Sequence, residues 1–304
     1  KPSSSPFTGL SDSEQPKSKT QASKTQMLLV NSLKNLCFNL CTPKANFLYK
    51  YANPDNFTLL RNKIAEIIED EKIDLVHSHT RISSFILGKL HKKMKFPFVT
   101  TAHWVFTTKW GLKYITDWGE KSVAVSDDIK DYLMDNYSVA ESDIKVTING
   151  IDTDKFSPDT DTSDICRELG ITPHDTVIVY VSRLDESRSL VAKQLIEVAG
   201  EAYKTVENLK IVIVGGGDDY INIEKSVAKA NEEIGEDAII LTGARTDINK
   251  LVAIGDLFIG VSRAALEAMA AQKPVIIAGN EGYIGIFGED KFKISYDTNY
   301  YPCC

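Results

Sequence analysis

Residues 209–217 (LKIVIVGGG) place an unbroken apolar run directly before three glycines, and residues 262–282 (SRAALEAMAAQKPVIIAGNEG) continue the chain in a helix, strand and loop rhythm. A strand that is apolar on both faces is typical of a parallel sheet buried between two helix layers. Glycines after such a strand let backbone N–H groups approach a ligand closely. Gly215, Gly216 and Gly243, the last after the next strand, therefore indicate a binding site for the phosphates of a nucleoside diphosphate.

The same rhythm extends over most of the chain and predicts an α/β fold. In the first half we expect strands at 73–77, 97–102, 122–125 and 144–148, with helices between them. A turn-rich stretch at 149–158 follows, and strands are expected again at 176–181, 209–214, 238–242, 256–260 and 274–278. We therefore predict two Rossmann-like parallel-sheet domains, residues 27–150 and 151–304, facing each other across a cleft. Residues 1–26, rich in Ser, Lys, Gln and Thr, are expected to be disordered.

Composition excludes several classes of protein. The net charge of −7 argues against nucleic acid as the main partner, because binding to phosphate backbones needs clustered Lys and Arg. Five cysteines without disulfide-framework spacing favour a reducing compartment, and Cys37 and Cys41 are expected in a core. Neither a long apolar run nor a signal-peptide pattern occurs, so we expect a cytoplasmic location, compatible with peripheral membrane contact. No Cys/His cluster has zinc spacing, and we expect no metal site and no cofactor.

Two arginines follow the first strand of the second half. Arg183 comes just after 176–181, at the edge of the sheet where ligands bind, and Arg188 lies five residues later. Two guanidinium groups at this position can clamp a pyrophosphate, since each presents a planar fork of donors. The alternative is a surface arginine paired with Asp185 or Glu186.

Two further features point to the same edge of the sheet. Glu267 lies in an Ala-rich helix, where a carboxylate is expected to hold ribose hydroxyls or a cation; the alternative is a solvated Glu that interacts with the helix dipole. The loop after the strand 274–278 carries Asn280, Glu281 and Gly282, which can direct N–H groups and a helix N-terminus toward phosphate.

In the first half, His103 follows a strand and enters an aromatic loop that contains Trp104, Phe106 and Trp110. A histidine there can orient a hydroxyl or take a proton, and the aromatic rings can stack on a sugar; a hydrogen-bonded loop histidine is the alternative. His77 and His79 are expected to point in opposite directions and to have structural roles.

Seven segments, in this order, resemble the family 4 retaining glycosyltransferases of the GT-B fold: 74–80 (DLVHSHT), 99–103 (VTTAH), 122–127 (SVAVSD), 146–156 (VTINGIDTDKF), 182–184 (SRL), 211–217 (IVIVGGG) and 266–274 (LEAMAAQKP). The resemblance covers roughly residues 60–287 and implies sugar transfer from a nucleotide diphosphate sugar, of UDP or GDP type, to a glycan or lipid acceptor. It also implies retained anomeric configuration and no obligatory metal.

The resemblance assigns roles to individual positions. Arg183 and Arg188 match the Arg and Lys that hold the donor diphosphate, and Glu267 matches the second Glu of a pair, which holds the ribose. His103 matches the His near the donor sugar and acceptor, and residues 280–282 would lie against the donor phosphates. We therefore expect His103, Arg183 and Arg188 to be catalytic.

The sequence also departs from the family. Ile259 stands where the first Glu of the pair is expected. The N-terminal, acceptor-side domain is expected to be incomplete, without its first strand and glycine-rich loop, and the C-terminal, nucleotide-sugar-binding domain is expected to be truncated at its end. These departures keep two alternatives open: a catalytically inactive GT-B module that binds a nucleotide or a partner, and a sugar-nucleotide epimerase.

Overall fold

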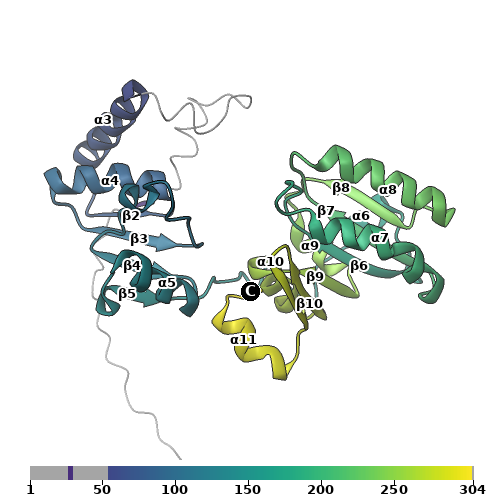
Figure 1. Cartoon of the computed structure of the whole chain (residues 1–304). Helices are drawn as coiled ribbons and strands as arrows, with labels where there is room; N and C mark the ends of the chain where they lie inside the picture. The colour runs from purple at the N-terminus through teal and green to yellow at the C-terminus, as the bar shows by residue number, and fades with distance from the viewer. Residues whose placement is uncertain (1–26, 30–53, 303–304) are drawn as a thin grey trace, which may run out of the picture.

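The computed structural model describes residues 27–29 and 54–302, and these form two α/β domains joined by a single linker (Figure 1). We call them the N-domain and the C-domain. Each contains a largely parallel sheet with helices packed on it, as the alternation of strands and helices predicts. The expected disorder of residues 1–26 and the expected burial of Cys37 and Cys41 lie outside the described residues.

The N-domain sheet has five parallel strands in the order β1-β2-β3-β4-β5. Its helices are α3 (Pro54–Asp70), α4 (Arg81–Met94) and α5 (Asp127–Tyr137), with short 3-10 turns η2 (Leu112–Ile115) and η3 (Glu141–Asp143). Local sequence sets the helix ends. The Thr80 side chain accepts a hydrogen bond from the Ser83 N–H at the start of α4, and Lys95 ends it in the left-handed conformation. The strands are β1 (Met27–Leu29), β2 (Leu75–Ser78), β3 (Phe98–Ala102), β4 (Lys121–Ala124) and β5 (Ile144–Val146).

Strand β1 corrects the sequence analysis, which expected no strand before residue 73. Its backbone pairs in parallel with β2, with Met27 opposite Leu75 and Leu29 opposite His77. Three residues are too few to show a period of two in the sequence, so the strand is defined only by its pairing with β2.

The C-domain sheet has six strands in the order β11-β10-β9-β6-β7-β8, and all neighbours are parallel except β10 and β11. The strands are β6 (Thr176–Val181), β7 (Leu209–Val214), β8 (Ile239–Gly243), β9 (Leu257–Gly260), β10 (Val275–Gly279) and β11 (Gly282–Ile286). The helices are α6 (Ser163–Leu169), α7 (Leu190–Thr205), α8 (Tyr220–Ile234), α9 (Ile248–Ala253), α10 (Ser262–Ala270) and α11 (Phe292–Asp297), with the 3-10 turn η4 (Glu289–Lys291).

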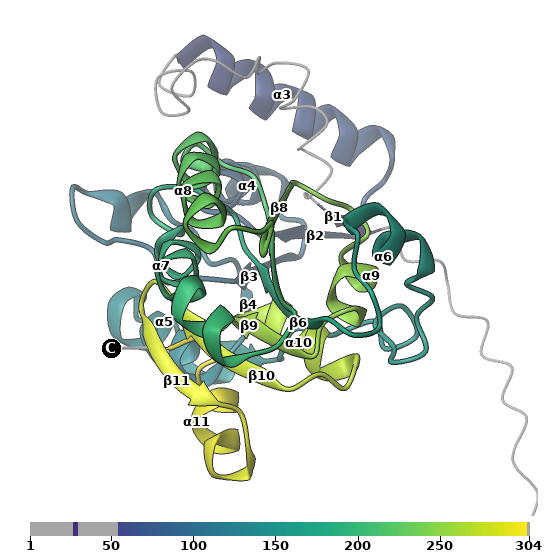
Figure 2. The same ribbon diagram turned by 90° about the vertical axis from the view of Figure 1, so that its right-hand side faces the viewer.

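Strand β7 is covered on both faces, as its apolar sequence predicts. Leu209, Ile211 and Ile213 pack with α7 and α8 on one side. Val212 and Val214 pack with residues of α6, α9 and α10 on the other. Figure 2 shows α7 and α8 on one side of strands β6 to β8, and α6 and α9 on the other. Apart from Lys210 near its start, the side chains of β7 are apolar and buried, so we expect ligand-binding chemistry in the loops at its carboxyl end.

The order of the strands creates one reversal. From β6 the chain proceeds to β7 and β8 on one side, then returns to place β9 and β10 on the other side of β6. The loops after β6 and β9 therefore diverge at their carboxyl ends and leave a crevice between them, which is where open α/β sheets bind ligands.

The loop at residues 280–282 differs from expectation. The sequence predicts a helix N-terminus after it, but Gly282 begins β11, which turns back antiparallel to β10. Gly282 and Gly285 adopt φ values of 152° and 113°, which favour glycine, and they allow the tight reversal. No helix dipole therefore follows this loop directly.

Substitution of Gly215 tests whether the glycines after β7 are needed for close backbone packing. Its φ is 153°, and a Cβ placed on it would lie 1.8 Å from the Ser182 carbonyl oxygen. We expect Gly215→Ala to lower the free energy of unfolding by about 2 kcal/mol or more, from backbone strain and overpacking. Urea unfolding of Gly215→Ala and of the unsubstituted protein measures the difference in the free energy of unfolding.

Gly216→Ala is the matched control for this substitution. The added Cβ would meet the Ala244 Cβ at 3.4 Å, an ordinary contact, and Gly216 is absent from the residues with positive φ. We expect a change smaller than about 1 kcal/mol. Equal stability of the two variants would contradict the assignment of Gly215 to the packing of β7 against the loop after β6.

Candidate functional site

A cavity of about 220 Å³ lies at the carboxyl ends of β6, β9 and β10, at the reversal in strand order. We call it the strand-end cavity. Residues of the C-domain form most of its wall, and Trp104 of the N-domain also lines it. Its lining residues are Trp104, Tyr180, Val181, Ser182, Arg188, Gly260, Val261, Ala278, Gly279, Asn280, Glu281 and Tyr301.

The two candidate arginines occupy different positions. Arg188 lines the strand-end cavity, and its N–H is fixed by a 2.8 Å hydrogen bond to the Asp185 carbonyl. Arg183 lines neither this cavity nor the one between the domains. Its side chain is 64% exposed, and its Nε lies 3.9 Å from Asp185, a contact of little energetic weight. The structure thus brings Arg188, but not Arg183, to the cavity wall.

The glycines after β7 and β8 hold the loops in place. The Gly215 N–H donates to the Gly243 carbonyl at 2.9 Å, and the Leu184 N–H donates to the Gly216 carbonyl at 3.0 Å. Gly243 itself has a φ of 74°. The Gly215 amide, expected to point at a ligand, therefore has a backbone partner.

Glu267 already has a cationic partner. Its Oε1 accepts a 2.8 Å hydrogen bond from the Arg263 Nε, one turn earlier in α10, and its side chain is 11% exposed. The sequence predicts that a carboxylate here holds a cation or hydroxyls, and the structure supplies the cation from the same helix. Arg263 was not singled out from sequence, although its i,i+4 spacing from Glu267 was a usable signal.

The loop after β10 contributes two of its three candidates to the cavity wall. Asn280 lines the strand-end cavity, and its side-chain amide donates to the Ser187 carbonyl. Glu281 lines both this cavity and the one between the domains. Gly282 is exposed, and a Cβ on it would approach Pro302 at 3.3 Å.

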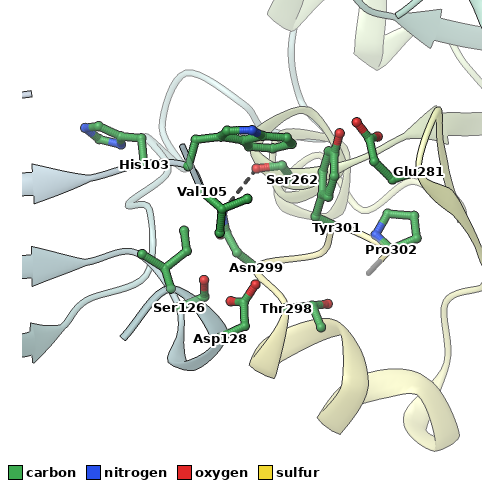
Figure 3. Close-up of a pocket in the computed structure, with 12 residues that line it drawn as sticks. His103, Val105, Ser126, Asp128, Ser262, Glu281, Thr298, Asn299, Tyr301 and Pro302 are labelled. Atoms are coloured by element: carbon green, nitrogen blue, oxygen red, sulfur yellow. Dashed lines mark hydrogen bonds between the residues drawn. The ribbon is translucent and has the colours of Figure 1, made fainter. Parts of the chain in front are cut away.

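A second cavity, of about 270 Å³, lies between the two domains (Figure 3). We call it the interdomain cavity. The N-domain contributes the loop after β3 and the start of α5, and the C-domain contributes Ser262, Glu281 and most of residues 298–302. The lining residues are His103, Trp104, Val105, Ser126, Asp128, Ile129, Ser262, Glu281, Thr298, Asn299, Tyr301 and Pro302.

Residues 298–302 were not singled out from sequence, and Tyr301 within them lines both cavities. The Trp104 and Tyr301 rings meet edge to face with centroids 4.7 Å apart, so one aromatic pair joins the domains. The Asn299 amide donates to the Ser262 hydroxyl at 3.2 Å, and the Ser262 N–H donates to the Tyr300 carbonyl at 2.7 Å. These contacts join residues far apart in the chain, so no local sequence pattern indicates them.

His103 lines the interdomain cavity, as expected, but its ring is turned away from the C-domain. In Figure 3 the ring points away from Tyr301 and Glu281. His103 Nε2 lies 2.9 Å from His79 Nδ1, a hydrogen bond, and the two rings stack with centroids 5.2 Å apart. To reach a ligand in the cavity, the His103 ring must leave this hydrogen bond.

The expectation that His77 and His79 point in opposite directions is wrong. Their ring centroids lie 4.2 Å apart, because residues two apart along an extended chain share a face. Partial burial, together with the neighbouring His79 and His103, lowers the pKa of His77 to about 4. Burial also lowers the pKa of His79, and burial with the charge of His79 lowers that of His103. The cluster is therefore neutral at pH 7.

Models of two known families match the chain in succession. The model described as Glycosyltransferase Family 4 matches residues 28–155, and the one described as Glycosyl transferases group 1 matches residues 175–297. The chain belongs to the family 4 glycosyltransferases. The two matches divide the chain near the linker between the domains.

Among curated proteins, the chain is similar to N-acetyl-alpha-D-glucosaminyl L-malate synthase of Bacillus anthracis, with 25% identity over 80% of this chain and 65% of that protein. It is also similar to alpha-monoglucosyldiacylglycerol synthase of Streptococcus pneumoniae, with 24% identity over 77% of this chain and 58% of that protein. The chain thus spans about two thirds or less of the length of these two relatives.

The fold is GT-B, as the sequence predicts. The structure of Anabaena HepE in complex with UDP-glucose superposes with a TM-score of 0.60 at 18% identity, over 79% of this chain and 75% of that chain.

Within residues 27–29 and 54–302, no group of three or more His, Cys, Asp or Glu side chains is arranged to hold a metal ion. The described part of the chain also contains no helix with the length and apolar character needed to cross a membrane.

The histidine cluster predicts a dependence of stability on pH. The pKa of His77 is about 4 in the folded protein, against 6.5 for a free side chain, so the unfolded state binds more protons between these values. The stability that this difference gives is fully present above pH 6.5 and is lost as pH falls toward 4. For this half-buried group, we expect a loss of about 1–2 kcal/mol in the free energy of unfolding.

Urea unfolding at pH 7 and pH 4.5 measures this loss. In His77→Gln the difference between the two pH values should be smaller than in the unsubstituted protein. His174→Gln, at an exposed histidine of the C-domain, serves as the control and should leave the difference unchanged. An equal loss in His77→Gln and the unsubstituted protein would show that His77 does not carry the effect.

Proposed function

We propose that the protein transfers a sugar, with retention of anomeric configuration, from a UDP- or GDP-type donor to a glycan or lipid acceptor. The observation that carries this proposal is the strand-end cavity, which lies at the strand reversal of a family 4 glycosyltransferase and has Arg188 in its wall. Five cysteines without disulfide-framework spacing support work in the cytoplasm, including at a membrane surface.

In this proposal, Arg188 binds the donor diphosphate, and Asn280 and Glu281 lie against the donor. Arg188 lines the cavity, and its guanidinium group carries a positive charge. It would stabilise the charge that develops on the departing diphosphate, as preorganised cationic groups do in many enzymes. Arg183 would join it by moving in from solvent, since the one ion pair that it makes with a described residue is the weak contact with Asp185.

We further propose that the reaction requires no metal ion and no cofactor. Two guanidinium groups can supply positive charge beside the diphosphate, which is the role a divalent cation plays in other transferases. Turnover that is unchanged by a chelator would support this part of the proposal, and loss of turnover restored by a divalent cation would reject it.

The acceptor would enter the interdomain cavity, which adjoins the strand-end cavity through Trp104, Glu281 and Tyr301. Two features support binding of a hydroxylated group there. Aromatic rings present flat apolar faces to a sugar, and the hydroxyl of Ser126, which is 3% exposed, has no hydrogen-bond partner among the described residues. His103 would turn from His79 to hydrogen-bond the acceptor hydroxyl or the donor sugar.

The names of similar proteins support donor and acceptor classes of these kinds. HepE is seen with UDP-glucose, and the name of the Streptococcus pneumoniae relative denotes a glucosylated diacylglycerol product. The name of the Bacillus anthracis relative denotes a glucosaminyl product of malate, which is neither a glycan nor a lipid. The donor class is therefore better supported than the acceptor class.

A catalytically inactive binding module is the second candidate. The position expected to carry the first Glu of the pair is Ile259, 7% exposed in the core on β9, and Glu267 is engaged by Arg263. Donor binding without sugar turnover would favour this candidate. Conversion of the donor to an epimer in the absence of an acceptor would favour the sugar-nucleotide epimerase.

Donor binding is tested first with Arg188→Ala and titration calorimetry, using UDP and GDP. Removing a charged contact to the diphosphate should weaken binding about ten- to a hundredfold, equivalent to about 1.5–3 kcal/mol. Arg167→Ala, at an exposed arginine of α6 outside both cavities, is the control and should bind like the unsubstituted protein. Unchanged affinity in Arg188→Ala would remove the cavity as the diphosphate site.

The Arg183→Ala variant distinguishes the role of Arg183 from that of Arg188. If Arg183 joins the diphosphate only when the donor is bound, its loss should weaken UDP or GDP binding while the melting temperature stays unchanged, because the side chain is 64% exposed. A lower melting temperature with unchanged affinity would assign Arg183 to structure.

His103→Ala tests the acceptor side. We expect turnover of the donor sugar to fall while affinity for the nucleoside diphosphate stays nearly constant, since the diphosphate would be held by the C-domain. His174→Ala, at an exposed histidine that lines neither cavity, is the matched control. Equal turnover in the two variants would exclude a role of His103 in transfer.

A further inference from the structure

One stretch of the N-domain has an unusual distribution of charge. Residues 75–116 contain no Asp or Glu, yet they carry seven Lys or Arg residues, in a chain whose net charge is −7. The basic residues are Arg81, Lys89, Lys92, Lys93, Lys95, Lys109 and Lys113. This part of the acceptor-side domain is therefore positively charged on an acidic protein.

The same stretch contains the two most exposed large hydrophobic side chains among the described residues. Trp110 is 93% exposed and Tyr114 is 85% exposed, whereas the next highest values, at Tyr283 and Ile286, are 68%. Lys109 and Lys113, both exposed, alternate with the two aromatic residues in the sequence KWGLKY. We call residues 109–114 the aromatic tip.

The backbone of the tip projects these side chains outward. Trp110 has a φ of 59° and Gly111 a φ of 73°, two successive left-handed residues before η2. For a bulky residue such as Trp this conformation is strained, and it persists only where the surrounding structure or a function requires it. A glycine at 111 relieves part of this cost.

The base of the loop is fixed, so the exposure of the tip is not due to a loosely held segment. The Arg81 guanidinium donates to the Thr107 carbonyl at 2.9 Å and lies over the Phe106 ring, 4.6 Å from its centroid. The Phe106 N–H donates to the Tyr132 hydroxyl at 3.1 Å, and the Tyr132 hydroxyl donates back to the Phe106 carbonyl.

The acidic residues that follow the stretch are engaged elsewhere. Asp117 accepts from the Gly119 N–H at 3.0 Å and its carboxylate lies close to Gly88 of α4. Glu120 accepts from the Phe98 N–H at 3.2 Å, and Asp143 pairs with Lys121 at 2.7 Å. Lys109 and Lys113 have no ion pair among the described residues, so their charges are available to an outside partner.

We propose that the aromatic tip docks the protein on the surface of a lipid bilayer that contains anionic lipids. Trp and Tyr side chains favour the headgroup region of membranes, where the ring is partly buried and its polar atom stays hydrated. Lysines beside them add attraction to anionic headgroups, and their long stems let the ammonium group reach the phosphates.

The position of the tip links this surface to the proposed acceptor site. The loop that carries the tip begins with His103, Trp104 and Val105, which line the interdomain cavity. A docked tip would hold that cavity beside the headgroups, which suits an acceptor exposed at a bilayer surface. This link rests on the proposed function, whereas the docking itself does not.

The test is co-sedimentation of the full chain with vesicles of phosphatidylcholine alone and with about one third phosphatidylglycerol, at low and high salt. We expect binding to the anionic vesicles at low salt, weaker binding at high salt and little to phosphatidylcholine alone. Trp110→Ser/Tyr114→Ser should weaken binding about tenfold or more, and Lys109→Glu/Lys113→Glu by about fivefold or more per lysine.

Matched controls alter the same residue types elsewhere. Tyr283→Ser/Phe292→Ser removes two exposed aromatic side chains of the C-domain, and Lys225→Glu/Lys229→Glu reverses two exposed charges of α8. Both control variants should bind vesicles like the unsubstituted protein.

Tryptophan fluorescence gives a second measurement. A blue shift of Trp emission on vesicle binding should occur in the unsubstituted protein and be lost in Trp110→Phe, because Trp118 is buried and Trp104 packs on Tyr301.

Three results would overturn the proposal: no binding of the unsubstituted protein to anionic vesicles at low salt, equal binding by the tip variants and the unsubstituted protein, or tip-dependent self-association in sedimentation velocity without vesicle binding.

UDP and GDP titration of Trp110→Ser/Tyr114→Ser without vesicles separates this proposal from the proposed function. Normal nucleotide affinity with failed docking rejects only the membrane surface. Failed nucleotide binding by the unsubstituted protein, with docking intact, rejects only the donor site.

Discussion

The two-sided burial of the central C-domain strands is the constraint on which the rest of the structure depends. Strand β7 buries Leu209, Ile211 and Ile213 on one face and Val212 and Val214 on the other, so apolar packing fills both faces along most of its length. Backbone groups are free to meet a ligand only where the strands end. Loop conformation at that edge therefore decides what the domain can bind.

At this edge of the sheet, the glycines hold the loops in place and Arg188 lines the cavity. Gly215 and Gly243 are joined by a backbone hydrogen bond that sets the separation of the loops after β7 and β8. That rigid frame leaves the loop after β6 to present Arg188, whose own N–H is tied to Asp185. This hydrogen bond fixes the backbone at Arg188, while its exposed side chain remains free to change rotamer.

Much of the fold was predictable because its elements are long and periodic. The nine strands expected from sequence correspond to β2 to β10, with ends shifted by at most two residues. The missed strands, β1 and β11, are defined by pairing and by glycine geometry rather than by alternation. At the site, Arg188, Asn280, Glu281 and His103 do line cavities. The i,i+4 spacing of Arg263 and Glu267 was a local signal for the partner of Glu267 that the sequence analysis did not use. Sequence could not reveal the orientation of His103 or the contacts of Tyr301, because each depends on rotamers and long-range packing.

The contact between Trp104 and Tyr301 has a consequence for motion. These rings belong to different domains, so a rotation that opens the interdomain cavity must either separate them or pull residues 298–302 away from Ser262. An edge-to-face aromatic pair contributes about 0.5–1.5 kcal/mol, so separating the rings alone shifts the opening equilibrium only about two- to tenfold. The pair therefore favours the observed arrangement of the two domains only weakly, by an amount comparable to thermal energy.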